Sequence, residues 1–324
     1  MRGNTKKTSS CSRKNHPRGM ALIAVLWLIA VLAFASLTAI QLLSFELDVA
    51  DSQINGFRAR QAAEMGIAVG ANPVVKRDDP LLQMTGEDGT SYRVDLRSEG
   101  ERFNINYMLL NTNDKNLLKQ IFLSWGIDED AAQDIADAML DWVDSNDEEQ
   151  LNGAERSYYE ELGRINQPFN RPFYTLDEMR LVRGMELVEQ CKPDWRDWFT
   201  IWSAGGLDIN EASAEKITLA AECNLEDANT LVEIVRGPDG VRGTDDDAPF
   251  QSLNGGQGGN TVFQILRVPE FYAQVVTPRL AANDGTTRIE SVGQAGDTKR
   301  RIVLVMRNRT GRPAILEKIE EVVP

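Results

Sequence analysis

The chain has 324 residues, with 35 Lys and Arg, 49 Asp and Glu, three cysteines and one histidine, and its formal net charge is −14. This length allows two domains at most, and 42% hydrophobic with 26% charged residues is typical of a globular protein rather than a disordered one. The acidic balance argues against a nucleic-acid surface, and a single histidine, His16, excludes Ser-His-Asp triads and histidine-ligated zinc unless His16 itself serves.

A basic stretch without acids precedes a long apolar run at the N-terminus. Residues 1–19 contain six Lys and Arg, and no charge follows between Gly19 and Phe45. As a helix, the run Met20 to Leu43 would extend about 36 Å, enough to cross about 30 Å of hydrocarbon. Basic flanks stay in the cytoplasm, so we expect a single-pass protein whose C-terminal bulk is exported.

Three interpretations compete for this segment. A cleaved secretory signal has a shorter apolar core before a small-x-small site, which Ala33, Ala35 and Ala39 could imitate. A plain signal anchor is the second interpretation. In the third, the chain is cut between Gly19 and Met20, and the apolar helix stays on the mature protein.

The string Arg18-Gly19-Met20-Ala21-Leu22-Ile23-Ala24-Val25-Leu26-Trp27 resembles the processing site of type IV prepilins and pseudopilins. The resemblance implies cleavage after Gly19 by a prepilin peptidase and N-methylation of Met20.

The helical pattern continues beyond the bilayer length. Leu47, Ala50, Ile54 and Phe57 follow at steps of three and four among charged residues, and Pro73 sets the end. We therefore expect one helix over residues 20–72, in which Leu47, Ile54 and Phe57 pack against neighbouring subunits. A membrane anchor with a stalk is the alternative.

Ala24 departs from the pilin pattern. Most pilin-like proteins carry a glutamate as the fifth residue after the cut, where it is thought to meet the charged N-terminus of a neighbouring subunit. An ionised carboxylate inside the membrane costs at least about 2.5 kcal/mol unless it is paired. A subunit with Ala24 avoids that cost and lacks the contact, which suits the end of a filament. This absence resembles the protein K family of type II secretion pseudopilins.

The exported part combines strand and helix patterns. Alternation predicts strands at 92–96, 103–106, 286–290 and 301–306, with turns at 87–89, 98–100 and 293–296. Residues 116–142 and 214–236 are helix-periodic, so the fold class is α+β. The resemblance implies a pilin-like antiparallel sheet, formed by residues 73–106 and 276–324. A large helical domain over 107–275 is inserted in it, after the leader 1–19 and the helix 20–72.

The helical part contains a weak internal repeat. Phe103-Asn104-Ile105-Asn106 and Leu207-Asp208-Ile209-Asn210 each precede a helix, after which Glu129-Asp130-Ala131 and Glu226-Asp227-Ala228 open another. Two helix hairpins follow from this pattern. A DNA-binding role is disfavoured because acids such as Asp128 and Asp134 would repel phosphate. Segments including Asp141-Trp142-Val143-Asp144 and Gly153-Ala154-Glu155 also resemble protein K.

Two acidic loops are candidate calcium sites, because calcium prefers carboxylate and carbonyl oxygens. The first spans residues 144–155, but Glu149 stands where an EF-hand needs glycine, so it is not an EF-hand. The second is the glycine-rich loop 237–247. The candidate ligands are Asp144, Asp147 and Glu155 in the first loop and Asp239, Asp245, Asp246 and Asp247 in the second. A solvated acidic turn is the alternative for each, and the resemblance implies calcium, which protein K binds.

Loss of the leader removes Cys11 and leaves Cys191 and Cys223. A disulfide between them could add about 3 kcal/mol by closing a loop of about 30 residues. Two thiols too far apart to bond are the alternative.

The resemblance implies a non-enzymatic minor pseudopilin at the tip of a short periplasmic filament, held in the inner membrane. Its partners would be other minor pseudopilins and the prepilin peptidase. A minor pilin of a type IV pilus is the alternative within the class. A membrane-anchored periplasmic hydrolase using paired carboxylates is the alternative outside it, although no Asp-Thr/Ser-Gly string occurs.

Overall fold

The structure is a computed structural model that describes residues 18–256 and 260–323. Two compact units divide the chain, Met1–Asn55 and Gly56–Pro324. The leader residues 1–17, with Cys11 and His16, lie outside the described residues.

A single helix, α1 (Arg18–Ala71), covers 54 residues and confirms the long helix expected from the sequence. Every side chain described between Leu22 and Ile54 is exposed. By length and composition, the helix from Leu22 to Ala71 is long and apolar enough to cross a membrane. It ends just before Asn72 and Pro73, because proline disfavours helical conformation in the residue that precedes it.

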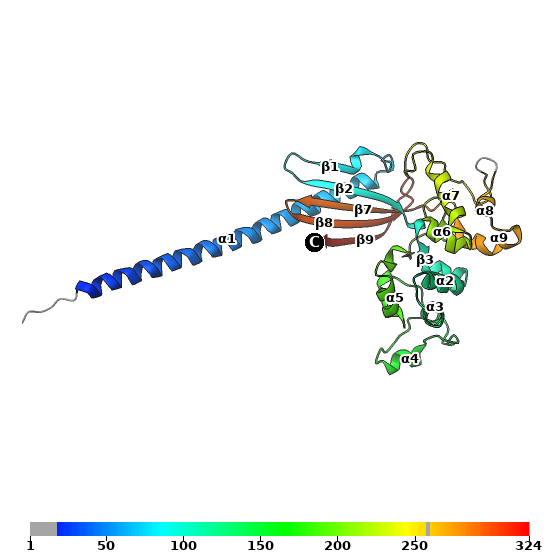
Figure 1. Ribbon diagram of the computed structural model, residues 1–324, viewed down its shortest axis with the longest axis horizontal. Helices are drawn as coiled ribbons and strands as arrows, with labels where there is room; N and C mark the ends of the chain where they lie inside the picture. Colours follow the sequence, from blue (N-terminus) through cyan, green and yellow to red (C-terminus); the bar gives the residue numbers. More distant parts are fainter. Residues whose placement is uncertain (1–17, 257–259, 324) are drawn as a thin grey trace, which may run out of the picture. The chain divides into compact units, whose positions relative to one another are not determined.

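The second unit contains a five-stranded antiparallel sheet in the order β1-β2-β7-β8-β9 (Figure 1). Its strands are β1 (Gln83–Thr85), β2 (Ser91–Ser98), β7 (Thr286–Ala295), β8 (Thr298–Arg307) and β9 (Ala314–Val323). The two halves of the sheet therefore come from distant parts of the chain. In β2, alternate residues are buried, as the sequence pattern predicts for a strand with one covered face.

The last turns of α1 cover this face of the sheet. Ala62 packs with Val94, Leu96, Ile289 and other apolar side chains of the sheet in one cluster. Glycines allow the close approach: a Cβ added at Gly293 would lie 2.0 Å from the carbonyl oxygen of Ala59. The contact of helix with sheet therefore depends on the absence of a side chain at this position.

One predicted turn and one predicted strand differ from the structure. The turn expected at 293–296 is wrong, because Gly293 pairs with Arg300 inside the β7–β8 ladder and the chain turns at Gly296 and Asp297 instead. Gly293 serves the contact with α1 rather than a turn. The strand expected at 103–106 is only two residues long, because the chain enters a π-helical turn at Tyr107.

Between β2 and β7 lies a helical region with two short pairs of parallel strands. The strands are β3 (Phe103–Asn104), β4 (Phe199–Thr200), β5 (Leu207–Asp208) and β6 (Leu280–Ala281). The helices are α2 (Lys115–Ser124), α3 (Glu129–Val143), α4 (Arg156–Glu161), α5 (Met185–Cys191), α6 (Ala214–Ala221), α7 (Leu225–Arg236), α8 (Val262–Ile265) and α9 (Glu270–Val276). Shorter helical turns are η1 (Pro80–Leu82), η2 (Glu99–Glu101), η3 (Tyr107–Asn111), η4 (Leu176–Leu181), η5 (Trp195–Asp197) and η6 (Thr277–Arg279).

The two predicted helix hairpins are confirmed as α2–α3 and α6–α7. Left-handed residues, Gly126 in the first and Glu222 in the second, separate the paired helices. Asp114 and Asp128 cap the helices of the first hairpin by accepting backbone N–H groups. Each of the helix-periodic segments 116–142 and 214–236 therefore forms two helices joined by a short turn.

Equivalent asparagines close the two repeats. Asn106 accepts from Phe173 N at 2.8 Å and donates to Phe173 O at 2.9 Å. Asn210 makes the same pair of bonds to Phe250, at 2.8 and 2.9 Å. The repeat thus fixes a Pro-Phe segment downstream of each hairpin.

The second unit has two hydrophobic clusters. The larger lies in the helical region and includes the buried Trp142, Tyr159 and Trp195, and the smaller lies between α1 and the sheet. The structure therefore confirms the α+β class, with a long apolar helix, an antiparallel sheet and an inserted helical region. The exact domain boundaries stay a prediction.

Candidate functional site

The surface of α1 carries the residues predicted for assembly. Leu47, Ile54 and Phe57 are 64%, 50% and 60% exposed, and Ala24 is also exposed. Gly19 and Met20, predicted to flank the processing site, lie in the first turn of α1. The apolar surface of this helix has no covering element among the described residues up to Ile54.

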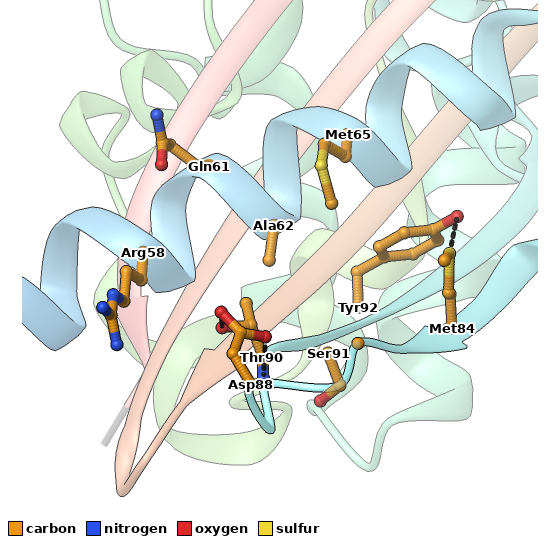
Figure 2. Close-up of a pocket in the computed structure, with 10 residues that line it drawn as sticks. Arg58, Gln61, Ala62, Met65, Met84, Asp88, Thr90, Ser91 and Tyr92 are labelled. Atoms are coloured by element: carbon orange, nitrogen blue, oxygen red, sulfur yellow. Dashed lines mark hydrogen bonds between the residues drawn. The ribbon is translucent and has the colours of Figure 1, made fainter.

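A cavity of about 260 Å³ lies between the last turns of α1 and the β1–β2 hairpin (Figure 2). Figure 2 shows Met65 on α1 above Tyr92, whose hydroxyl lies 3.8 Å from the sulfur of Met84. The one carboxylate in its lining, Asp88, already accepts hydrogen bonds from the backbone and side chain of Thr90. The cavity therefore does not supply the carboxylate pair that the hydrolase interpretation requires.

Asp141 is the centre of the first acidic loop, although the sequence analysis did not select it as a ligand. Its buried carboxylate accepts from Gln150 N at 3.2 Å and from Ala154 N at 2.9 Å, and burial raises its pKa to about 6. A Cβ at Gly153 would lie 1.7 Å from Asp141 Oδ2, so the loop closes on this carboxylate. The only signal in the sequence was an aspartate on the apolar face of α3.

Glu155 lies beside Asp141 and is 4% exposed. Within residues 18–256 and 260–323, neither of its carboxylate oxygens has a hydrogen-bond partner. Burial, together with the smaller effect of the charges of Asp141, Asp144 and Asp147, raises the pKa of Glu155 to about 7. A buried carboxylate without donors is unfavourable unless a proton or a cation compensates it.

The other two predicted ligands of this loop are less enclosed. Asp144 accepts from Asn146 N at 3.2 Å, and burial raises its pKa. Asp147 is exposed and accepts from Asn170 Nδ2 at 3.0 Å. In the described part of the chain, no three His, Cys, Asp or Glu side chains are arranged as a metal site. Calcium here would also need backbone or water oxygens, which it commonly takes.

The second acidic loop uses its carboxylates differently. Asp246 accepts from Asp239 N and from Thr244 Oγ1, at 3.1 and 2.6 Å, while Asp247 accepts from Gly243 N at 2.7 Å. The ammonium group of Lys76, 2.7 Å from exposed Asp245, lowers the pKa of that carboxyl. Hydrogen bonds within the loop thus hold most of these oxygens, and Oδ1 of Asp247 is buried without a partner among the described residues.

Both acidic loops occupy the same place in the internal repeat. Each follows the second helix of a hairpin, α3 or α7, and each precedes the Pro-Phe segment that Asn106 or Asn210 holds. In the sequence the two loops and the repeat are separate patterns, and in the structure each loop belongs to one copy of the repeat.

Cys191 and Cys223 are both free in the structure. Cys191 is exposed at the end of α5, whereas Cys223 is partly buried after α6, where burial raises its pKa to about 11. The structure therefore shows two separate thiols at Cys191 and Cys223 rather than a disulfide.

Comparisons with known proteins agree with this architecture. Residues 101–193 match the family described as type II secretion system (T2SS), protein K. An Escherichia coli (strain K12) protein described as "Putative type II secretion system protein K" is 25% identical over 194 residues, or 53% of this chain. The match spans 59% of that relative, which is less than two thirds of its length.

The fold also matches a solved structure, the GspK-GspI-GspJ complex from the type 2 secretion system of enterotoxigenic Escherichia coli. The TM-score is 0.59 at 12% identity, over 86% of this chain and 98% of the solved chain. The helical region, the sheet and the family match point to one assignment. By sequence, residues 101–193 belong to the type II secretion system protein K family, and the chain shares the fold of the solved secretion-system chain over most of its length.

Proposed function

We propose that the chain is a minor pseudopilin that helps to assemble the tip of the type II secretion pseudopilus. A prepilin peptidase would cut it after Gly19 and methylate Met20. The helix would hold it in the inner membrane, with Gly56–Pro324 in the periplasm. The observation that carries this proposal is the apolar surface of α1, which is exposed from Leu22 to Ile54.

The exposed surface is longer than a membrane requires. Residues 22–57 of a helix extend about 54 Å, against about 30 Å of hydrocarbon. Leu47, Ile54 and Phe57 therefore lie beyond the length that lipid would cover, and they remain exposed. Exposed apolar stripes of this kind mark contacts with other proteins, and neighbouring pseudopilin helices would supply them.

Ala24 supports a place at the end of the filament. At this position, a charged side chain would cost free energy in the membrane unless a neighbour paired with it. A subunit with no other subunit above it has no need of that pair. The solved complex names GspI and GspJ beside GspK, and we propose the corresponding minor pseudopilins as partners of this chain.

We further propose that the loop 144–155 binds calcium through Glu155, Asp144 and Asp147, with Asp141 beside them. The support is the buried carboxylate of Glu155, which has no donor among the described residues. Calcium at the second loop would take Asp239, Asp246 and Asp247, and it would compete with Lys76 for Asp245.

Photo-crosslinking in cells tests the assembly role. A photoreactive residue at Leu47 or Phe57 should crosslink to other minor pseudopilins, whereas one at exposed Asp297, in the β7–β8 turn, serves as the control. If Leu47 and Phe57 crosslink only to lipid, α1 serves only as a membrane anchor, and the proposal is contradicted.

A further inference from the structure

A charged cavity lies in the second unit, and Arg242 of the second acidic loop contributes to its lining. One part measures about 320 Å³, and Arg97, Glu101, Glu211 and Arg242 connect it to a second part of about 260 Å³. The two parts are lined by six cationic side chains and four acidic ones. The cations are Arg77, Arg97, Arg102, Lys216, Arg236 and Arg242, and the acids are Asp95, Glu101, Asp197 and Glu211. A net positive cavity is unexpected in a chain with a net charge of −14.

Glu211 is shared by several guanidinium groups. Arg77 Nη1 lies 2.8 Å and Arg242 Nη1 lies 3.3 Å from Glu211 Oε2. Burial lowers the pKa of Arg242, and the charges of Arg77 and Arg236 lower it further. Three like charges near one carboxylate repel one another, so the cluster lacks negative charge.

Several donors in this cavity have no acceptor. Among residues 18–256 and 260–323, Arg242 Nε and Nη2, Arg236 Nε and Arg102 Nε are buried without a hydrogen-bond partner. The Arg102 residue is 6% exposed. Arg102 still lies near two carboxylates, with Nε 3.9 Å from Glu101 Oε1 and Nη2 3.6 Å from Asp197 Oδ1. Buried donors are normally satisfied in native proteins, so the N–H groups of Arg236 and Arg242 leave room for an acceptor.

Lys216 adds a further positive charge. Its ammonium group donates to the backbone oxygens of Glu101 and Asp197, at 3.0 and 2.9 Å, and burial lowers its pKa to about 8. Its hydrogen-bond acceptors are neutral carbonyls rather than carboxylates. The ammonium nitrogen also lies 5.5 Å from the centre of the Trp198 ring, a cation–π contact, and none of the described carboxylates accepts a hydrogen bond from it.

The lining also limits the kind of ligand. It contains no aromatic side chain that could stack on a base or a sugar ring. Guanidinium groups bind phosphate and carboxylate oxygens through paired N–H donors. We propose that this cavity is a binding site for a compact oxyanion, a phosphate or carboxylate group, held by Arg102, Arg236, Arg242 and Lys216.

Calorimetric titration of the full-length chain in uncharged detergent micelles tests this site. Inorganic phosphate and citrate are titrated separately at pH 7, in calcium-free buffer whose ionic strength is held constant with sodium chloride. Saturable binding of phosphate alone assigns a phosphate site, and binding of citrate alone assigns a carboxylate site; either result supports the proposal. No saturable binding of either one would overturn it.

Substitutions locate the binding. Arg236→Gln should weaken it at least about tenfold, because it removes a charged donor. Arg312→Gln, in the exposed β8–β9 turn, makes the same charge change and should alter affinity by less than about twofold. Equal weakening by both variants would indicate a non-specific effect of charge and overturn the site. Arg236→Lys keeps the charge and should weaken binding less than Arg236→Gln. If near-UV circular dichroism shows that Arg236→Gln is unfolded, Arg236→Lys is used in its place.

Discussion

Glu155 is buried beside Asp141, and its pKa of about 7 lies well above the ordinary value of 4.5 because burial disfavours its charged form. The native state therefore holds this proton more tightly than the unfolded state does. The resulting stabilisation is complete below pH 4.5 and is lost as pH rises through about 7.

We predict that, without calcium, the free energy of unfolding falls between pH 4.5 and about 7. Glu155→Gln should make this dependence shallower, because the amide carries no charge at any pH. Urea titrations of both proteins in EDTA measure it. Parallel pH profiles for the two proteins would show that Glu155 is not responsible.

Calcium should act on the same residue with the opposite sign, because it stabilises the ionised carboxylate. At a hundred times the dissociation constant, a ligand stabilises the native state by about 2.7 kcal/mol, and each kcal/mol raises Tm by about 2 to 4 °C in a unit of this size. We expect millimolar calcium to raise the Tm of the native chain more than that of Glu155→Gln, which keeps only the second acidic loop.

Glu149→Gln is the control for the calcium experiment, since Glu149 is an exposed residue of the same loop. It should keep the full rise in Tm. A native chain that shows neither a shift in Tm nor bound metal by mass spectrometry would remove the calcium proposal.

The substitution Gly293→Ala adds one methyl group at the contact between α1 and the sheet, and so tests how tight this contact is. Gly293→Ala places a Cβ 2.0 Å from Ala59 O and 2.4 Å from Ala63 N, so helix or strand must move. Overpacking of this kind costs about 1–3 kcal/mol. Gly311→Ala, with 4.0 Å to the nearest atom, should change stability by less than about 0.5 kcal/mol. Chemical denaturation compares the two variants, and equal stabilities would contradict the tight contact.

Among the elements, α1 has two parts that differ in exposure. Residues 56–71 pack on the sheet and share its hydrophobic cluster, whereas the side chains from Leu22 to Ile54 are exposed. A change in the exposed part should therefore affect assembly and leave the fold of Gly56–Pro324 intact.

Ala24→Glu provides this test. A carboxylate in the membrane-length part of the helix costs about 2.5–3.5 kcal/mol unless it is paired. We expect unchanged Tm and lower yields of crosslinks from Leu47 to other pseudopilins, while Ala24→Leu leaves both unchanged. A lower Tm for Ala24→Glu would mean that position 24 contributes to the folded unit, and it would contradict the prediction.

The sequence predicted elements wherever a pattern was local. The long helix and both hairpins have strong periodicity, and they are confirmed. The sequence did not predict strand β9. Ala314–Val323 is an edge strand without buried residues, so its sequence lacks the alternation of apolar and polar residues that predicts a strand.

The sites depend on contacts between distant residues, which no local pattern reveals. Asp141 became part of the first acidic loop because Gly153 and Ala154 fold back on it. The charged cavity gathers residues from Arg77 to Arg242. The sequence supplied the acidic ligands as candidates, but only the structure shows which carboxylate lacks a partner.

At the scale of the whole molecule, charge and anchoring are linked. The proposed cleavage after Gly19 would remove six basic residues and change the formal net charge from −14 to −20. The mature chain would then be a strongly acidic protein whose first helical segment, from Met20 to Phe45, carries no charged side chain. Such a protein gains from cations, as the calcium proposal requires, and its solubility is high away from the helix.

The central claim is that α1 is kept on the mature protein as a surface for assembly. Mass spectrometry of the N-terminal peptide, from protein purified from the membranes of its native cells, tests this claim most directly. We predict a peptide that begins at Met20 and carries an N-methyl group. A mature chain that begins near Ser36 or Leu37 would show that the helix is discarded, and it would contradict the account.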